Sequence, residues 1–118
     1  MMANGPVHTQ LADRWGTLTI SEQMGNVGSE VGRAIRAHDA GNVTRFDAAL
    51  SRALELFDLT AADNRWRGPR RREILRAREE FCRVFFDGPA EPHMVGGLEN
   101  YFRYFAQVAN AQRRPESG

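Results

Sequence analysis

Lysine is absent from this chain of 118 residues, although the sequence carries sixteen basic side chains, all of them arginine. Genomic base composition is the simplest explanation. Arginine nevertheless has a planar guanidinium that binds phosphate in bidentate fashion and stacks on flat rings, which lysine does not. The formal net charge is only +1. The chain is therefore not a polycation, and any electrostatic function depends on where its arginines cluster.

Cysteine and long apolar runs are also scarce. Cys82 is the only cysteine, which excludes a disulfide framework and a cysteine-based zinc site and suits a reducing compartment. No apolar run is long enough to span a bilayer, and residues 1–10 lack the basic and then apolar pattern of a signal peptide. We expect a cytoplasmic protein with no membrane association and no cofactor.

Four segments repeat their apolar residues with the period of a helix, and none alternates apolar and polar residues as a half-buried strand does. Thr19 and Glu22 form a capping box at the start of the first segment. Pro69 suits the first turn of the third segment, and Gly88 with Pro89 ends it. The expected helices cover residues 20–38, 43–62, 69–86 and 96–113.

Short connections place sequential helices antiparallel, and a chain of this length forms one domain. We therefore predict an all-α fold, an antiparallel up-down-up-down four-helix bundle over residues 17–113. An irregular N-terminal arm at residues 1–16 precedes it, and a frayed tail at residues 114–118 follows it.

The third predicted helix has an arginine, Arg78, in the middle of its apolar arc. A guanidinium there needs a partner, because it does not lose its charge when it is buried. Glu30 lies at the same level of the first helix, which runs parallel, so we predict a buried Arg78–Glu30 ion pair with Asp58 as the reserve partner. The residues expected to face inward around Arg78 are Ile74, Leu75, Phe81, Cys82, Phe85 and Phe86.

Three glycines, Gly25, Gly28 and Gly32, share one narrow face of the first predicted helix. Each glycine inside a helix destabilises it by about 1 kcal/mol relative to alanine, so a neighbouring helix is expected to pack closely there. That neighbour belongs either to the same chain or to a second protomer, and we predict a homo-oligomer that forms through this face. A phosphate-cradling glycine loop would need a preceding strand, and none is predicted.

Arginines gather most densely just before and within the third predicted helix. The topology brings this segment to the same pole as Arg14, Trp15, Arg113 and Arg114, while acidic residues collect at the opposite pole. Exposed arginine beside aromatic rings suits phosphate contacts and base stacking. We predict non-catalytic binding of RNA or DNA; the alternatives are a protein adapter with an acidic partner and a purely solubilising role. The predicted contact residues are Arg65, Trp66, Arg67, Arg70, Arg71 and Arg72.

Signals of catalysis are few, because His8, His38 and His93 lie far apart and show no metal-ligand spacing. The segment from Arg33 to His38 resembles the Arg-x4-His signature of HEPN ribonucleases, which are also helical bundles. That resemblance implies a second possible function, in which Arg33 and His38 line a dimer cleft and cleave RNA. No other base or metal cluster accompanies this pair, so the protein is predicted not to be an enzyme.

The segment from Gln23 to Ile35, together with Leu54–Thr60 and Tyr101–Ala106, resembles a group of small bacterial helical proteins of unknown function, over about residues 15–112. More remotely, the chain is similar to the four-helix-bundle family encoded in ribosomal RNA intervening sequences, which includes the accessory variability protein of diversity-generating retroelements. This resemblance implies a homo-oligomeric ring with a basic surface that binds nucleic acid, and it implies no catalytic residue.

Overall fold

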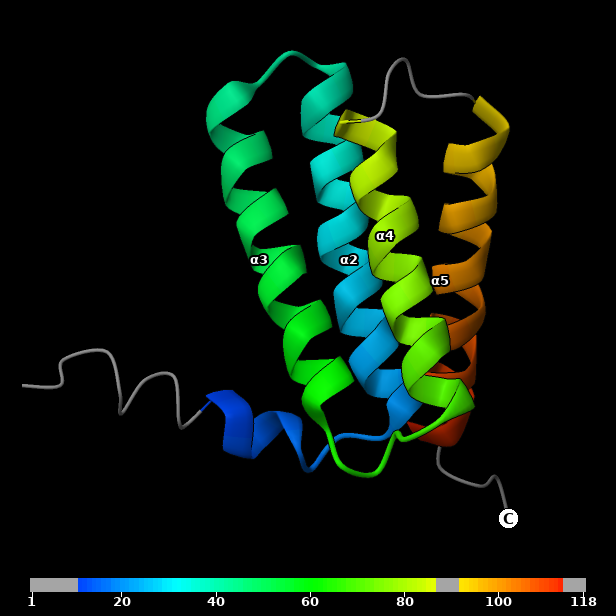
Figure 1. Cartoon of the computed structure of the whole chain (residues 1–118). Helices are drawn as coiled ribbons and strands as arrows, with labels where there is room; N and C mark the ends of the chain where they lie inside the picture. The colour runs from blue at the N-terminus through cyan, green and yellow to red at the C-terminus, as the bar shows by residue number, and fades with distance from the viewer. Residues whose placement is uncertain (1–10, 87–91, 114–118) are drawn as a thin grey trace, which may run out of the picture.

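The computed structural model describes residues 11–86 and 92–113. Its long helices are α2 (Ile20–Asp39), α3 (Val43–Ala62), α4 (Pro69–Phe86) and α5 (Pro92–Arg113). They pack antiparallel in an up-down-up-down bundle, which confirms the predicted fold (Figure 1). A short helix at residues 11–15 precedes them. Most of the predicted arm, residues 1–10, and the predicted tail, residues 114–118, lie outside the described residues.

Local side-chain chemistry explains where the helices begin. The hydroxyl of Thr19 accepts a hydrogen bond from the backbone N–H of Glu22, whose carboxylate accepts one from the N–H of Thr19, so the predicted capping box is confirmed. The side chain of Asn42 caps α3 after Gly41 has turned the chain with a φ of 70°. Helix α5 begins at Pro92 rather than at the predicted residue 96, because proline fits the first helical turn.

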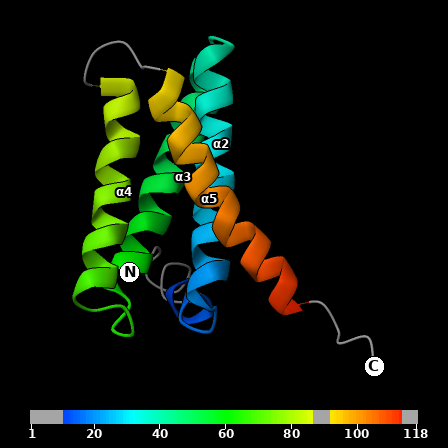
Figure 2. The same ribbon diagram turned by 90° about the vertical axis from the view of Figure 1, so that its right-hand side faces the viewer.

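Helix α2 lies between α3 and α5 and packs closely against both, whereas α4 contacts α3 and α5 more sparsely. Figure 2 shows that α5 crosses α2 obliquely, so that its C-terminal end swings away from the start of α4. Among the described helices, none has the length and apolar character needed to cross a membrane.

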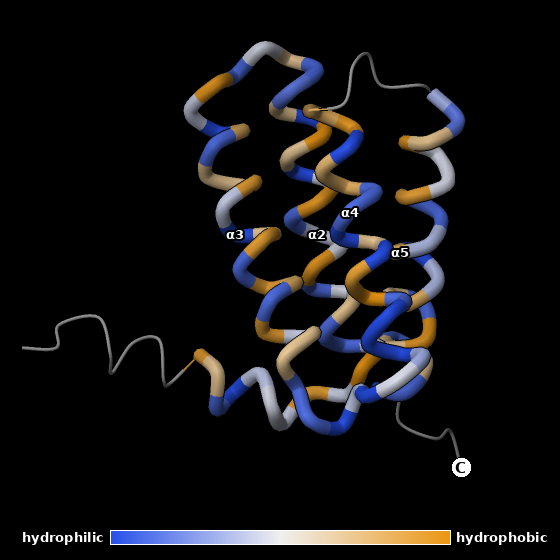
Figure 3. The backbone as a smooth tube through the Cα atoms, viewed as in Figure 1, coloured by the Kyte–Doolittle hydropathy of each residue, from blue (hydrophilic) through white to orange (hydrophobic). Residues whose placement is uncertain are grey.

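The core forms where the apolar faces of all four long helices meet (Figure 3). Helix α4 is rotated relative to the prediction, because Ala77 and Val84 are buried while Leu75 and Phe86 are 46% and 65% exposed. The expected burial of Leu75 and Phe86 was therefore wrong, and Cys82 is only partly buried. The largest fully buried apolar side chains are Met24, Val27, Val31, Phe57, Ile74 and Phe81.

The rotation of α4 also changes the partner of Arg78. Its Nε donates to Oδ1 of Asp58 at 3.0 Å, and the two side chains are 35% and 64% exposed. Glu30 pairs instead with Arg33 at 2.6 Å, so the predicted buried Arg78–Glu30 pair was wrong and the reserve partner was right. The physical reason is that Arg78 turns toward the neighbouring helix α3. An exposed pair of this kind stabilises the fold by at most about 1 kcal/mol.

Two of the three glycines on this face of α2, Gly25 and Gly28, lie against α5 of the same chain. A Cβ built on Gly28 would lie 2.6 Å from Cβ of Phe102, and one on Gly25 would lie 3.7 Å from Cα of Ala106. Gly28 therefore permits a helix contact that any larger residue would obstruct. Self-association through this face stays a prediction.

We predict opposite effects of alanine at these two glycines. Gly28→Ala should destabilise the protein by about 1–3 kcal/mol, because the added methyl group overpacks against Phe102. Gly25→Ala should stabilise it by up to about 1 kcal/mol, because the methyl fits and alanine favours a helix. Urea unfolding of both variants measures this difference. Equal destabilisation by both would show that α5 does not pack on α2 in this register.

Candidate nucleic-acid interface

A buried amide, that of Gln23, organises the pole at which α4 begins. Its side chain is 0% exposed. The Nε2 atom donates to the carbonyl oxygen of Trp15 at 2.8 Å and to Oδ2 of Asp63 at 2.9 Å, while Oε1 accepts from Nε1 of Trp66 at 2.7 Å. Gln23 thus joins the short N-terminal helix, α2 and the connection between α3 and α4.

Trp15 belongs to the core, although the sequence places it in an irregular arm. Its side chain is 6% exposed. The indole Nε1 donates to Oγ1 of Thr60 at 2.9 Å, and the Thr60 hydroxyl donates to the carbonyl oxygen of Leu56 at 2.8 Å. Trp15 was expected to present its ring at an open basic surface. Its burial does not support that role.

Arg65 and Trp66, two of the predicted contact residues, also take part in the internal network. The Arg65 guanidinium donates to both carboxylate oxygens of Asp63 and to the carbonyl oxygen of Leu18. It also lies over the Trp66 ring, with Cζ 4.6 Å from the ring centroid. Trp66 is half-buried and its indole N–H is bonded to Gln23, so these residues shape the loop.

The remaining predicted residues form the surface that we call the arginine loop: Arg67, Arg70, Arg71 and Arg72. Arg67 and Arg72 are exposed, and no carboxylate among the described residues lies within 4.0 Å of either guanidinium. Arg70 is also exposed and pairs with Glu73 at 3.3 Å. Arg71 is partly buried. The start of α4 is strongly hydrophilic in Figure 3.

Glu73 and Tyr101 connect the start of α4 to α5. The Tyr101 hydroxyl donates to the Glu73 carboxylate at 2.9 Å. Burial, and then this hydrogen bond, raises the pKa of Tyr101. One carboxylate oxygen of Glu73 thus accepts hydrogen bonds from both Arg70 and Tyr101.

The pole gathers fewer arginines than the topology predicts. Arg113 lies at the end of α5, which diverges from the start of α4 (Figure 2), and it donates to Asn110 on its own helix. Arg114 lies outside the described residues. The oblique crossing of α5 over α2 is the physical reason, because it carries the C-terminal end of α5 away from the arginine loop.

Arg33 and His38, the residues of the HEPN resemblance, have different neighbours. Arg33 binds Glu30, whereas the His38 ring packs against Phe46 and Phe85, with centroid distances of 5.4 and 5.1 Å. Within one chain, the structure does not bring the two side chains to a shared site. In the part of the chain that the structure describes, no group of three or more His, Cys, Asp or Glu residues could hold a metal ion.

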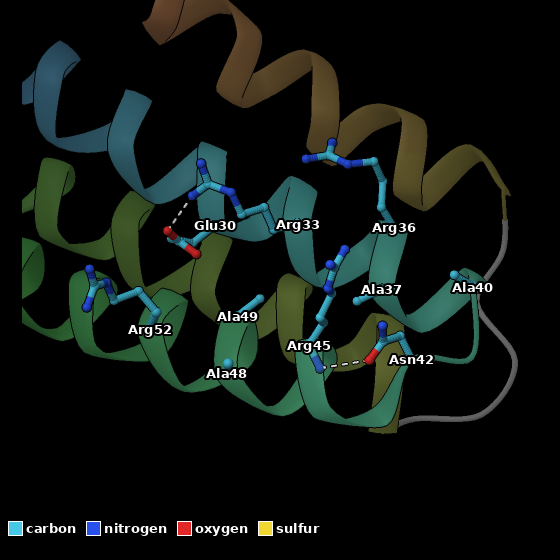
Figure 4. A pocket seen from close by; sticks show the side chains of 10 residues that line it. All are labelled: Glu30, Arg33, Arg36, Ala37, Ala40, Asn42, Arg45, Ala48, Ala49 and Arg52. Atoms are coloured by element: carbon cyan, nitrogen blue, oxygen red, sulfur yellow. Dashed lines mark hydrogen bonds and ion pairs between the residues drawn. The ribbon is translucent and has the colours of Figure 1, made fainter.

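A second basic surface, absent from the sequence prediction, lies on the outer side of α2 and α3 (Figure 4). This hollow, the α2–α3 groove, has a volume of about 780 Å³. Sequence reasoning missed it because its arginines are scattered over two helices and converge only when the helices pack. Its lining residues are Glu30, Arg33, Arg36, Ala37, Ala40, Asn42, Arg45, Ala48, Ala49 and Arg52.

No protein-family model, curated protein sequence or solved structure is significantly similar to this chain. The resemblances noted from the sequence therefore remain predictions, and functional inference depends on the chain's own residues.

The Asp63 carboxylate predicts a loss of stability in acid. Hydrogen bonds from the Arg65 guanidinium, aided by the Gln23 amide, hold the pKa of Asp63 far below its usual range, although its partial burial opposes this. An aspartate in an unfolded chain has a pKa of about 3.9. A carboxylate with a lowered pKa in the folded state stabilises the fold above the unfolded pKa, and this contribution disappears as pH falls.

We expect Asp63→Asn to be less stable than the wild type at neutral pH, with the difference shrinking below about pH 4. Arg65→Gln should reproduce the shallower acid dependence, because it removes the main cause of the lowered pKa. Urea midpoints measured across this pH range report both effects. A constant difference between wild type and Asp63→Asn at every pH would contradict the assignment.

Proposed function

We propose that this protein binds RNA or DNA without catalysis, through contacts between the arginine loop and phosphate groups. The observation that carries the proposal is the set of exposed guanidinium groups at the start of α4, of which Arg67 and Arg72 have no acidic partner among the described residues. Guanidinium groups in this state remain available for bidentate contacts to phosphate.

The first turn of α4 supports the same interpretation. It contains Arg70, Arg71 and Arg72 and no acidic residue. The positive end of a helix dipole disfavours cations there by about 0.3–1 kcal/mol each. This arrangement lowers the stability of the free protein, and a bound phosphate would relieve it. Stability alone therefore does not explain why three arginines occupy this turn.

Backbone groups at the start of α4 add to this electrostatic surface. Pro69, the first residue of the helix, has no N–H group, and Gly68 before it has no side chain that could cap the helix. The N–H groups of Arg70 and Arg71 therefore lack a capping side chain from the preceding residue. Free N–H groups at a helix start complement an anion.

The geometry favours contacts with phosphate over contacts with bases. Trp15 is buried, and Trp66 is bonded to Gln23 and covered by Arg65 on one face of its ring. The base stacking expected of these two tryptophans is therefore not supported. Binding that depends on phosphate contacts falls steeply with salt and discriminates little between sequences.

We expect Arg67→Gln/Arg72→Gln to weaken the binding of single-stranded RNA and DNA. The slope of log affinity against log salt should fall by about one for each phosphate contact removed. Mobility shifts at increasing salt measure both quantities. Arg83→Gln/Arg103→Gln is the matched control, because it removes the same charge from exposed positions whose guanidinium groups bond to neighbours on their own helices.

Two results would refute the proposal. One is the lack of any mobility shift by the wild-type protein at low salt. The other is cleavage of labelled RNA that disappears in His38→Ala, which would support the HEPN interpretation and end the non-catalytic one.

A further inference from the structure

The α2–α3 groove holds more positive charge than its acidic lining neutralises. Arg33 and Arg36 reach it from α2, and Arg45 and Arg52 reach it from α3. Among the described residues, Glu30 is the only acidic one that lines the groove, so four positive charges against one negative leave an excess of three. The Glu30 carboxylate is already bonded to Arg33, whose side chain is 61% exposed.

Arginine side chains from both helices border the same hollow. The Arg36 side chain folds back along α2 onto Gly32, where its Nη1 would lie 3.1 Å from a built Cβ, so its guanidinium points toward α5 and away from the alanines of the groove (Figure 4). The absence of a side chain at Gly32 leaves room for this conformation. Arg45 extends from α3 toward α2, beside Ala37 (Figure 4). Arg33 of α2 and Arg45 of α3 both line the groove.

The floor of the groove consists of small apolar side chains. Ala37 and Ala49 are 8% and 6% exposed, and Ala48 lies beside them in Figure 4. A flat floor of methyl groups flanked by guanidinium groups suits a molecule with an anionic part and a planar, weakly polar part. The volume of about 780 Å³ falls within the range of about 300–1,000 Å³ that is typical of small-molecule sites.

A partner helix is a poorer fit for this surface. Helix-in-groove recognition relies on large apolar side chains that enter apolar pockets. In the part of the chain that the structure describes, no apolar residue larger than alanine lines the α2–α3 groove. Affinity must therefore come mainly from the guanidinium groups, and these match the oxygen atoms of phosphate in bidentate geometry.

We propose that the α2–α3 groove is a binding site for the phosphate groups of nucleotides, with the sugar or base lying on the alanine floor. The nucleotide is either free or part of a nucleic-acid chain. An adjoining depression shares Glu30, Arg33 and Arg52 with the groove and continues past Arg14 and Leu18, so a chain has room to extend. This site is separate from the arginine loop and does not depend on its function.

The test uses calorimetric titration of the full chain with ADP, with pyrophosphate and with a short oligouridylate. Arg45→Gln/Arg52→Gln should weaken ADP binding by about tenfold or more, because each substitution removes a charge-assisted hydrogen bond. Arg83→Gln/Arg103→Gln removes the same charge elsewhere and should have little effect. Both groove arginines are exposed, so the urea midpoint should change little.

A second variant tests the floor without changing any charge. Ala48 is exposed within α3, and leucine favours a helix nearly as well as alanine, so Ala48→Leu should fold. We expect Ala48→Leu to weaken binding of ADP more than binding of pyrophosphate, because only ADP has a sugar and a base to place on the alanine floor.

The ligands distinguish the two sources of nucleotide. Binding of ADP that is lost in Arg45→Gln/Arg52→Gln supports a free nucleotide. Binding of the oligouridylate alone, lost in the same variant, supports nucleotides within a chain. The proposal is overturned if none of the three ligands responds to the groove substitutions, or if a polyglutamate peptide binds as tightly as the oligouridylate and with the same losses.

Failure here and failure of the proposed function are distinguishable. Loss of oligouridylate binding in Arg67→Gln/Arg72→Gln, with no effect of the groove variants, would retain the arginine loop and reject the groove. Loss of ADP binding in the groove variants, with no effect of the loop variants on the oligouridylate, would retain the groove and reject the arginine loop.

Discussion

The buried amide of Gln23 is the interaction on which the arrangement of one whole pole depends. Its two N–H groups and its oxygen all have partners, and those partners come from the N-terminal helix and from the segment before α4. A buried amide that lost one of them would destabilise the fold by about 1–3 kcal/mol. These hydrogen bonds hold Asp63 and Trp66, which belong to the connection between α3 and α4, against the buried amide.

This arrangement divides the arginines of the connection into two groups. Asp63 is bonded to Gln23 and to Arg65, whose side chain is 42% exposed and covers one face of Trp66. Arg67 and Arg72 remain exposed. A charged residue thus has a structural role when it completes a buried network, and it is available to a ligand when it does not. The proposed binding surface is therefore smaller than the number of arginines in this segment suggests.

Small residues on α2 and α3 produce the second basic surface. Gly28 and Gly25 let α5 approach α2 closely, while Ala34, Ala49 and Ala53 are buried in the core that α2 and α3 share with the other helices. Alanines line the hollow on the outer side of α2 and α3, and longer side chains lie around them. In this protein those longer side chains are arginines, which makes the α2–α3 groove basic.

The sequence by itself determined the helices, because their ends depend on neighbouring residues. The capping box at Thr19 and the turn at Gly41 act within one helical turn, so reading them needs no tertiary contact. The apolar period also sufficed to predict the bundle. Which surfaces face each other could be predicted only in part, because the rotation of a helix depends on how its side chains fit those of its neighbours.

Tertiary structure decided the features that involve distant residues. It rotated α4, so that Arg78 met Asp58, and it placed Trp15 beside Thr60 in the core. It also brought Arg33 and Arg45 to one groove. Each of these contacts joins residues of different segments, and the helical repeat of apolar residues does not predict such pairs. Their formation depends on the balance of packing over the whole bundle, whereas a helix end is determined by hydrogen bonds among adjacent residues.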